Sequence, residues 1–511
     1  MSAASVRKTA WILLFSLFAC YLSLAPATTS GRGYVYEDMQ SGLGLLTSFN
    51  AWIKGRPVPP ISWTRHGPVA LFLDLPFIKF GKFFISPDFV LSLQPLLLTA
   101  ATMVITYLWL MQLCTPGMSL LLTLIGAFGT MLWPYAYIGL ETKQSFFVLL
   151  AGYMALASGK IRTLPRLMLF STVCGLSISS KSTGIVLAPA IAYLIYVQFR
   201  NESRSQWKRL LTVLLLSGGI WTIAAVGANL FWAPHGGGMN LLLGQWTTDS
   251  PLQLFTNVLG IFGSPNKGLF VFAPVLLFSM WAIPRIFRTH REIALFALLV
   301  TACTVALVAI LVVSADEVWG PRFLHVSIAP LLVSIGAAWP RFQRQTTAPL
   351  LILGAIGLMI SFLGAFFYYG ARGEAAQAAG QNTLEWFGGD TVWNEVAFDG
   401  RLFHVWLKGG TGPVPWTPAH HWAWVPPQDA QPWKTINLRQ YVEPQSYLLR
   451  YWKAPLDGSA LLVYRICWTS LIAGLLLLAW VIVRTIKTIP AARLISAPIF
   501  TLRGRKASPT S

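Results

Sequence analysis

The chain has 511 residues, of which 55% are hydrophobic and only 11% are charged. Soluble domains carry roughly 25% charged residues, so this composition excludes a soluble globular protein and indicates a polytopic membrane protein. The net charge of +20 comes from basic clusters between apolar runs. That distribution is typical of loops facing an anionic membrane surface, and we expect no nucleic acid partner.

Apolar runs recur along the whole chain and predict an all-α bundle of about twelve transmembrane helices. A signal peptide is the alternative for the first run, because the sequence LAPATTS after it offers a cleavage pattern. The predicted spans are 9–28, 89–111, 118–136, 144–158, 166–180, 183–199, 210–232, 268–284, 292–314, 322–339, 347–369 and 459–483.

Basic residues fall in alternate loops, which predicts the orientation of the bundle. With the N-terminus in the cytoplasm, every basic cluster lies on the cytoplasmic side: the loops 159–166, 200–209, 284–292 and 341–345, and the C-terminal tail. An even number of spans follows, with both termini inside the inner (plasma) membrane. The long external segments are then 29–88, about 233–267, and 370–458.

The first external segment contains two apolar stretches with helical spacing. We expect an amphipathic surface helix over 43–53 and a second one over 69–84, which Pro76 should interrupt. The last external segment is rich in Trp, Pro and Gly and could fold as a small cap.

Several carboxylates lie on the predicted external side, next to lipid. Charges there are expensive and usually face a cavity or a partner. Glu37 and Asp38 follow the first span, and either could act as a base toward a hydroxyl group, although Asp38 could instead cap a helix. Glu141 is a second candidate, with an interfacial position above Trp and Tyr side chains as the alternative. For Asp316 and Glu317 a solvated turn is the simpler interpretation.

Cations gather on the same side. Lys181, Lys267 and Arg322 each lie at the end of an apolar run, where Lys and Arg can bind phosphate. The alternative is that they extend to lipid headgroups. His325 should lie on the same helix face as Arg322 and could line a cavity together with His66, although a packing role is the simpler interpretation.

Six stretches occur in an order that resembles bacterial membrane glycosyltransferases of the GT-C superfamily, which contains protein O-mannosyltransferases and lipid A aminoarabinose transferases. Together they cover roughly 30–335 of the chain. They are YED, RHGPVALFLDLP, GTMLWPYAYIGLET, SISSKSTGIVLAPA, SPNKGLFVFAPVLL and WGPRFLHVSIAPLL. The chain departs from the pattern at two carboxylates: relatives often have Asp-Glu where it has Glu37-Asp38, and Ser-Glu-Pro around the position of Glu141.

The resemblance implies transfer of a sugar from a polyprenyl-phosphate donor to a hydroxyl of a lipid, glycan or protein at the non-cytoplasmic face. Asp38 matches the family's first-loop base, with Glu37 adjacent and Glu141 also retained. Arg322 and the two lysines would hold the donor phosphate. No cofactor is assigned, and a divalent ion (Mg²⁺ or Mn²⁺) stays open. We expect Asp38, Arg322 and Lys267 to meet in one outward-facing pocket.

The resemblance also divides the chain. Residues 1–369 would form the GT-C-like catalytic region, 370–458 the external segment, and 459–511 the last transmembrane helix and the basic tail. Two other functions stay open. A transporter or flippase of lipid-linked sugars would need ionisable groups deep within the spans. An O-antigen-type polymerase or ligase would rely on external Arg residues without an essential first-loop carboxylate.

Overall fold

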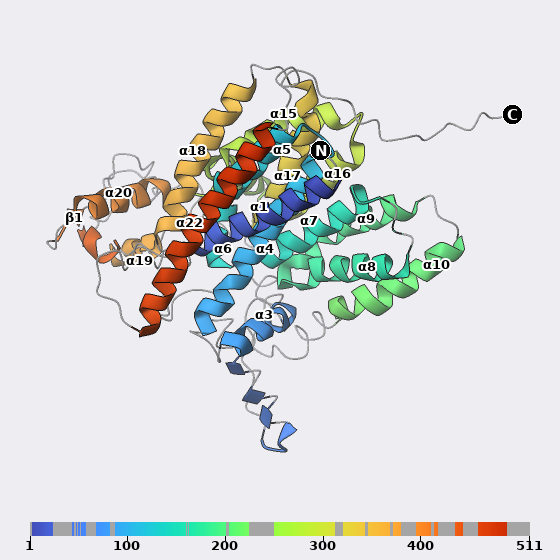
Figure 1. Ribbon diagram of the computed structural model, residues 1–511, viewed down its shortest axis with the longest axis horizontal. Coiled ribbons are helices and arrows are strands. Elements are labelled where there is room, and N and C mark those ends of the chain that lie inside the picture. Colours follow the sequence, from blue (N-terminus) through green and yellow to red (C-terminus); the bar gives the residue numbers. More distant parts are fainter. Residues whose placement is uncertain are drawn as a thin grey trace.

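The computed structural model is a bundle of helices, which Figure 1 shows packed at a range of tilts. The all-α class predicted from the sequence is confirmed for the part of the chain that the model describes; its only strands are β1 (Pro415–Trp416) and β2 (Ile436–Asn437), which pair antiparallel. The described residues are 3–23, 43–44, 47–48, 50–51, 53–57, 68–81, 87–139, 141–159, 161, 163–200, 204–223, 250–311, 320–342, 346–367, 371–379, 395–409, 413–416, 435–442 and 458–487.

The helices follow one another with short connections. In the first half they are α1 (Ala3–Ser23), α3 (Pro68–Gly81), α4 (Pro87–Leu110), α5 (Pro116–Phe128), α6 (Leu132–Ile138), α7 (Thr142–Leu156), α8 (Leu164–Ser179), η1 (Ser182–Leu187), α9 (Ala188–Phe199), α10 (Arg204–Val213) and the π-helix η2 (Leu214–Gly219). In the second half they are α13 (Pro251–Gly263), α14 (Leu269–Phe272), η3 (Pro274–Leu276), α15 (Leu277–Ile286), α16 (Arg291–Leu311), η5 (Arg322–Leu324), α17 (His325–Ala338), η6 (Trp339–Arg341), α18 (Thr347–Phe366), α19 (Ala371–Ala378), α20 (Glu395–Lys408), η10 (Leu438–Gln440) and α22 (Gly458–Lys487).

Every predicted span coincides with helical residues, but not every span is one long helix. Within the described ranges, six helices are long and apolar enough to cross a membrane, and further apolar helices have 10–17 residues. The six are Ala4–Ser23, Val90–Leu110, Arg291–Ile310, Arg322–Arg341, Thr347–Phe366 and Leu461–Lys487. The chain therefore has the character of a multi-pass membrane protein.

The predicted span 118–136 is wrong as a single helix, because the chain turns between α5 and α6. Gly129 caps α5, and α18 crosses at this point with its own backbone in close contact. A Cβ atom on Gly129 would lie 3.0 Å from the carbonyl oxygen of Gly354, and one on Gly357 would overlap the carbonyl of Gly129. Three glycines thus allow two backbones to meet where side chains would keep them apart.

The predicted span 268–284 is also divided. Pro274 restricts the residue before it, and Ala273 has φ −143° and ψ 67°, outside the helical region, so α14 ends there. A second apolar helix, α13, lies in the middle external segment, where none was predicted.

Pro76, in contrast, does not interrupt the first-loop helix as expected. Helix α3 runs through it, because the side-chain amide of Gln94 on α4 donates a hydrogen bond of 2.8 Å to the carbonyl oxygen of Leu73. Groups on a neighbouring helix can satisfy carbonyls that a proline frees. The expected helix over 43–53 lies largely outside the described residues.

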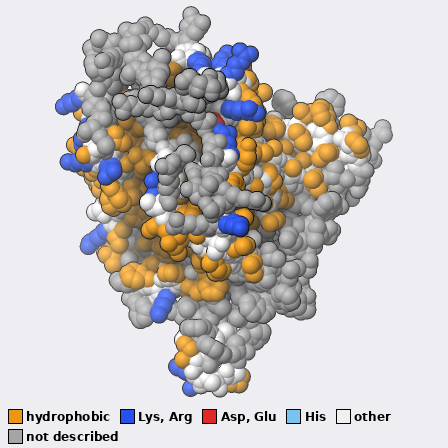
Figure 2. All heavy atoms as spheres, turned by 90° about the vertical axis from the view of Figure 1, so that its right-hand side faces the viewer, with side chains coloured by type: hydrophobic (Ala, Val, Ile, Leu, Met, Phe, Trp, Pro, Cys, Tyr) orange, Lys and Arg blue, Asp and Glu red, His pale blue; other side chains and the backbone are white. Residues whose placement is uncertain are grey.

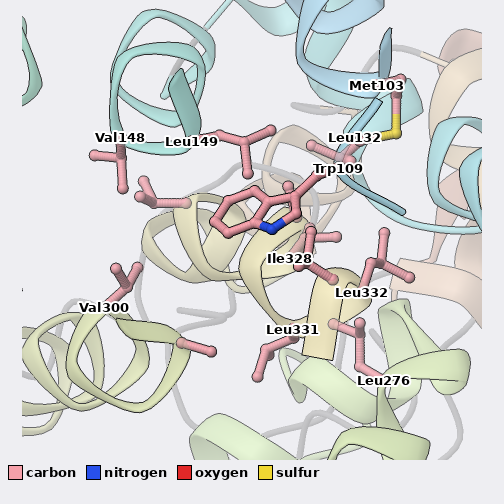
Figure 3. Packing of buried hydrophobic residues seen from close by; sticks show 14 of the residues in the cluster. Met103, Trp109, Leu132, Val148, Leu149, Leu276, Val300, Ile328, Leu331 and Leu332 are labelled. Carbon is pink, nitrogen blue, oxygen red and sulfur yellow. The ribbon is translucent and has the colours of Figure 1, made fainter. Parts of the chain in front are cut away.

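The core is centred on α17, whose residues are buried along the entire helix. Figure 3 shows the indole ring of Trp109 among Leu149, Ile328 and Leu332, which come from three other segments of the bundle. Gly152 on α7 makes room for a further ring, since a Cβ there would lie 2.5 Å from Phe296.

Two contacts define one end of the bundle. Helices α1 and α22 pack against each other, and Arg484 near the end of α22 donates to the hydroxyl of Ser5 at 3.0 Å. Figure 1 accordingly places the N-terminus beside the last turns of α22. Arg200, after α9, pairs with Glu292 at the start of α16 at 3.0 Å. The ends of the chain's helices therefore meet as the predicted alternation of loops requires.

The outer surface of the bundle is strongly apolar. Figure 2 shows hydrophobic side chains spread broadly over one face, with Lys and Arg side chains scattered among them and little acidic surface. Exposed large side chains include Leu215, Leu216, Leu476 and Ile486. Such a surface suits contact with acyl chains.

The described part of the last external segment packs on the end of α18. Helices α19 and α20 and strand β2 share a small core with Phe366 and Phe367, and the rings of Phe366 and Trp406 meet edge-on at 5.0 Å. Whether 370–458 works as a cap stays a prediction.

Candidate functional site

Glu141 is the centre of a buried ionic cluster at the junction of α6 and α7. Its side chain is fully buried, and its backbone is left-handed with φ 58°, which is unusual for a residue other than glycine. Gly139, also left-handed, ends α6 two residues earlier, and its carbonyl oxygen accepts a bond from the Thr142 hydroxyl at 3.0 Å. This tight turn directs the carboxylate into the bundle instead of toward lipid.

Two cations share one oxygen of this carboxylate. Lys181 Nζ and Arg322 Nε both donate to Glu141 Oε1, the arginine at 2.9 Å. The ring of Phe323 lies beside both cations, 4.3 Å from Lys181 Nζ and 4.7 Å from Arg322 Cζ. The trio brings together three segments that are far apart in the sequence.

Local turns place each cation. Lys181 has an extended backbone between the end of α8 and the start of η1. Arg322 begins η5 directly after Gly320 and Pro321, and Gly320 has φ 63°. A Cβ on Gly320 would lie 2.9 Å from the ring of Phe272, so both the conformation and the space at this turn favour glycine.

His325 lies one short turn beyond Arg322, as its spacing predicted. Its Nδ1 lies 2.6 Å from the hydroxyl of Ser145, and its ring packs against Tyr135 at 4.9 Å. His325 Nε2 is buried, and no described group bonds to it. Because Ser145 is one turn after Glu141, α7 and the start of α17 are joined at two successive levels.

A second buried ion pair, missed by the sequence analysis, lies beside the first. Lys143 Nζ is 2.7 Å from Asp74 Oδ2 on α3, and the Asp74 side chain is only 1% exposed. The signal for it was available: Asp74 is the only carboxylate in the apolar stretch 68–81, where burial of a charge requires a partner.

Lys267 is buried but is placed by a different turn. The hydroxyl of Ser264 accepts bonds from the backbone N–H groups of Asn266 and Lys267, at 3.1 and 3.3 Å. This turn leads into α14, whose Phe272 contacts Gly320. Lys267 therefore lies on a segment adjacent to the one that carries Arg322.

The expected readings of these residues can now be compared with their positions. The structure brings Glu141, Lys181 and Arg322 together and places His325 next to them. An interfacial position for Glu141 is wrong, since its side chain and the nearby Tyr135 are buried. Lys181 does not extend to lipid headgroups, because it is paired inside the bundle. The other predicted site residues, Glu37, Asp38, His66, Asp316 and Glu317, lie outside the described residues, as does the predicted pocket around Asp38.

The trio carries one positive charge in excess, from two cations on one carboxylate. A buried excess charge favours binding of an anion, and Lys and Arg are suited to phosphate oxygens. No group of three or more His, Cys, Asp or Glu side chains suited to a metal ion occurs in the described part of the chain.

Among solved structures, the chain is similar to ArnT from Cupriavidus metallidurans in the apo state, at 13% identity and a TM-score of 0.46, over 94% of this chain and 78% of ArnT. It is also similar to the apo Archaeoglobus fulgidus oligosaccharyltransferase, at 13% identity and a TM-score of 0.40, over 71% of this chain and 55% of that one. A structure of AglB from the same organism, with an inhibitory peptide and a dolichol-phosphate, gives 13% identity and a TM-score of 0.39, over 70% and 56%. No family model and no curated protein matches the chain.

These similarities fall among GT-C-like proteins, the class that the sequence motifs resemble. The likeness is one of fold. What the chain does is therefore argued below from the residues of its own site.

Proposed function

We propose that the chain is a membrane glycosyltransferase that moves a sugar from a polyprenyl-phosphate donor to an acceptor hydroxyl on the non-cytoplasmic face. One observation carries the proposal: Lys181 and Arg322 converge on a buried carboxylate inside an apolar helical bundle. A phosphate on a lipid chain fits such a position, because its headgroup requires cations while its tail requires apolar helices.

Each residue has a role in the proposed reaction. Arg322 and Lys181, with Lys267 on the adjacent turn, bind the donor phosphate and stabilise the negative charge that develops on it as the sugar departs. Glu141 holds the two cations in place. Asp38, or Glu37 beside it, removes the proton from the acceptor hydroxyl. The acceptor belongs to a lipid, a glycan or a protein.

The orientation is part of the proposal. The bundle end with Ser5, Arg200, Glu292 and Arg484 is placed in the cytoplasm, and the Glu141 cluster at the outer face of the inner membrane. Binding of the donor from the outer leaflet then requires no crossing of the bilayer.

The test combines cells with purified protein. Mass spectrometry of lipids and glycans from a deletion strain identifies the sugar modification that is lost, and this supplies donor and acceptor for an assay in detergent. Asp38→Asn should bind polyprenyl phosphate as wild type does and transfer no sugar. Transfer at the wild-type rate by Asp38→Asn would refute the mechanism. An assay with EDTA decides whether a divalent ion takes part.

The same assay separates the enzyme from a transporter. Transfer in detergent needs no sealed compartment, so a protein that only moves lipid-linked sugars across the bilayer gives no product there. A polymerase or ligase without a first-loop base would keep its activity in Asp38→Asn.

A further inference from the structure

The first turn of α7 makes a different long-range contact at almost every residue. Glu141 bonds to Lys181 and Arg322, Lys143 to Asp74 on α3, and Ser145 to His325 on α17. Between them, the side-chain amide of Gln144 lies 3.4 Å from the carbonyl of Ser177 on α8. This single turn therefore joins the first-loop helix to the elements that supply the cations.

The backbone at Glu141 needs such support. A left-handed conformation costs a non-glycine residue about 1–2 kcal/mol and persists where the surrounding structure determines it. Turning this residue back to an ordinary conformation would move its carboxylate away from Arg322. The contact nearest in sequence that fixes α7 from outside the cation cluster is the bond between Lys143 and Asp74.

We propose that Asp74 and Lys143 are positioning residues of the phosphate site. Their ion pair docks α3 on the first turn of α7 and so keeps Glu141 in the conformation that presents Lys181 and Arg322 to the donor phosphate. The inference rests on the proposed function. It makes the helix α3 of the first external loop a part of the donor site, although neither residue of the pair touches the donor.

The pair can be removed without leaving a buried charge unpaired. Replacing both partners of a buried ion pair by apolar residues of similar volume is often neutral for stability, whereas removing one is costly. We therefore choose the double variant Asp74→Leu with Lys143→Met. The matched control is Arg200→Gln with Glu292→Gln, which removes an ion pair at the other end of the bundle.

Binding of undecaprenyl phosphate to the purified full-length protein is measured by native mass spectrometry, with phosphatidylglycerol as an anionic competitor and thermal unfolding in parallel. The neutral double variant should unfold at the wild-type temperature and bind at least fivefold more weakly. The control should bind as wild type does. The charge-swapped variant Asp74→Lys with Lys143→Asp should recover most of the affinity, which a loss of packing alone would not allow.

Wild-type affinity in the neutral double variant overturns the inference and leaves the proposed function intact. If that variant does not fold, the charge-swapped variant decides: recovered affinity supports the inference, and a folded protein with weakened binding overturns it. A wild-type protein that binds undecaprenyl phosphate no better than phosphatidylglycerol overturns the proposed function, and this inference with it.

Discussion

Arg322 and Glu141 are 181 residues apart in the chain, yet Arg322 Nε donates to Glu141 Oε1 at 2.9 Å inside the bundle. Lysine has no second donor in a fixed fork, so Arg322→Lys keeps the charge and loses the geometry. We expect it to bind polyprenyl phosphate about tenfold more weakly, since a charge-assisted hydrogen bond contributes about 1.5–3 kcal/mol and 1.4 kcal/mol is a factor of ten. Equal dissociation constants for the two proteins would show that the guanidinium geometry is irrelevant.

Glu141→Gln tests the carboxylate by itself. It keeps the shape of the side chain but leaves Lys181 and Arg322 buried beside a neutral group, and breaking such a pair costs about 3–5 kcal/mol. The unfolding temperature should fall clearly. Glu292→Gln, which removes a partly exposed carboxylate, should cost about 0–1 kcal/mol. Similar unfolding temperatures for both variants would contradict the central place of Glu141.

The bond between Ser145 and His325 is open to a double-mutant cycle. Ser145→Ala leaves a buried ring nitrogen without its partner, at a cost of about 1–3 kcal/mol. Adding His325→Phe removes the orphaned nitrogen and keeps an aromatic ring against Tyr135. The double variant should therefore unfold at a higher temperature than Ser145→Ala alone. Additive losses would indicate that the two side chains do not interact.

Close packing of the first and last helices depends on Gly474. A Cβ there would lie 2.8 Å from the backbone nitrogen of Cys20 and 2.9 Å from its sulfur. Gly474→Val should lower the unfolding temperature by several degrees. Gly263→Ala is the control, because nothing lies within 4 Å of a Cβ at that position. If Gly474→Val is as stable as Gly263→Ala, α1 and α22 do not pack as described.

The proposed orientation can be checked by cysteine labelling in a variant without the five native cysteines. A cysteine in place of Arg166, before the exposed start of α8, should react with a membrane-impermeant maleimide only after the inner membrane is opened. One in place of Arg401 on α20 should react in cells whose inner membrane is intact. Reversed labelling would place the Glu141 cluster in the cytoplasm.

The sequence predicted the bundle well, because apolar runs and basic loops report directly on burial in lipid and on orientation. It predicted less well where the helices break. The division of 118–136 depends on α18 crossing at Gly129, a contact between residues more than two hundred positions apart. No local pattern contains that information. The bond from Gln94 that supports α3 around Pro76 is a second case.

The candidate site shows the same boundary. Placing Glu141, Lys181 and Arg322 on one side of the membrane followed from counting spans. Which carboxylate they would pair with did not, because the left-handed turn at Glu141 is set by its neighbours in space. The roles assigned to Asp38, Glu37 and His66 stay predictions from the motifs.

The contact between α1 and α22 has a consequence for biosynthesis. The first helix enters the bilayer while its main neighbour is still hundreds of residues from being translated, so until then only lipid or the insertion machinery can cover its inner face. Any premature stop before α22 leaves that face exposed in the membrane. Quality-control proteases that recognise unassembled helices would therefore have a single signal, the bare side of α1, that reports whether the chain has been finished.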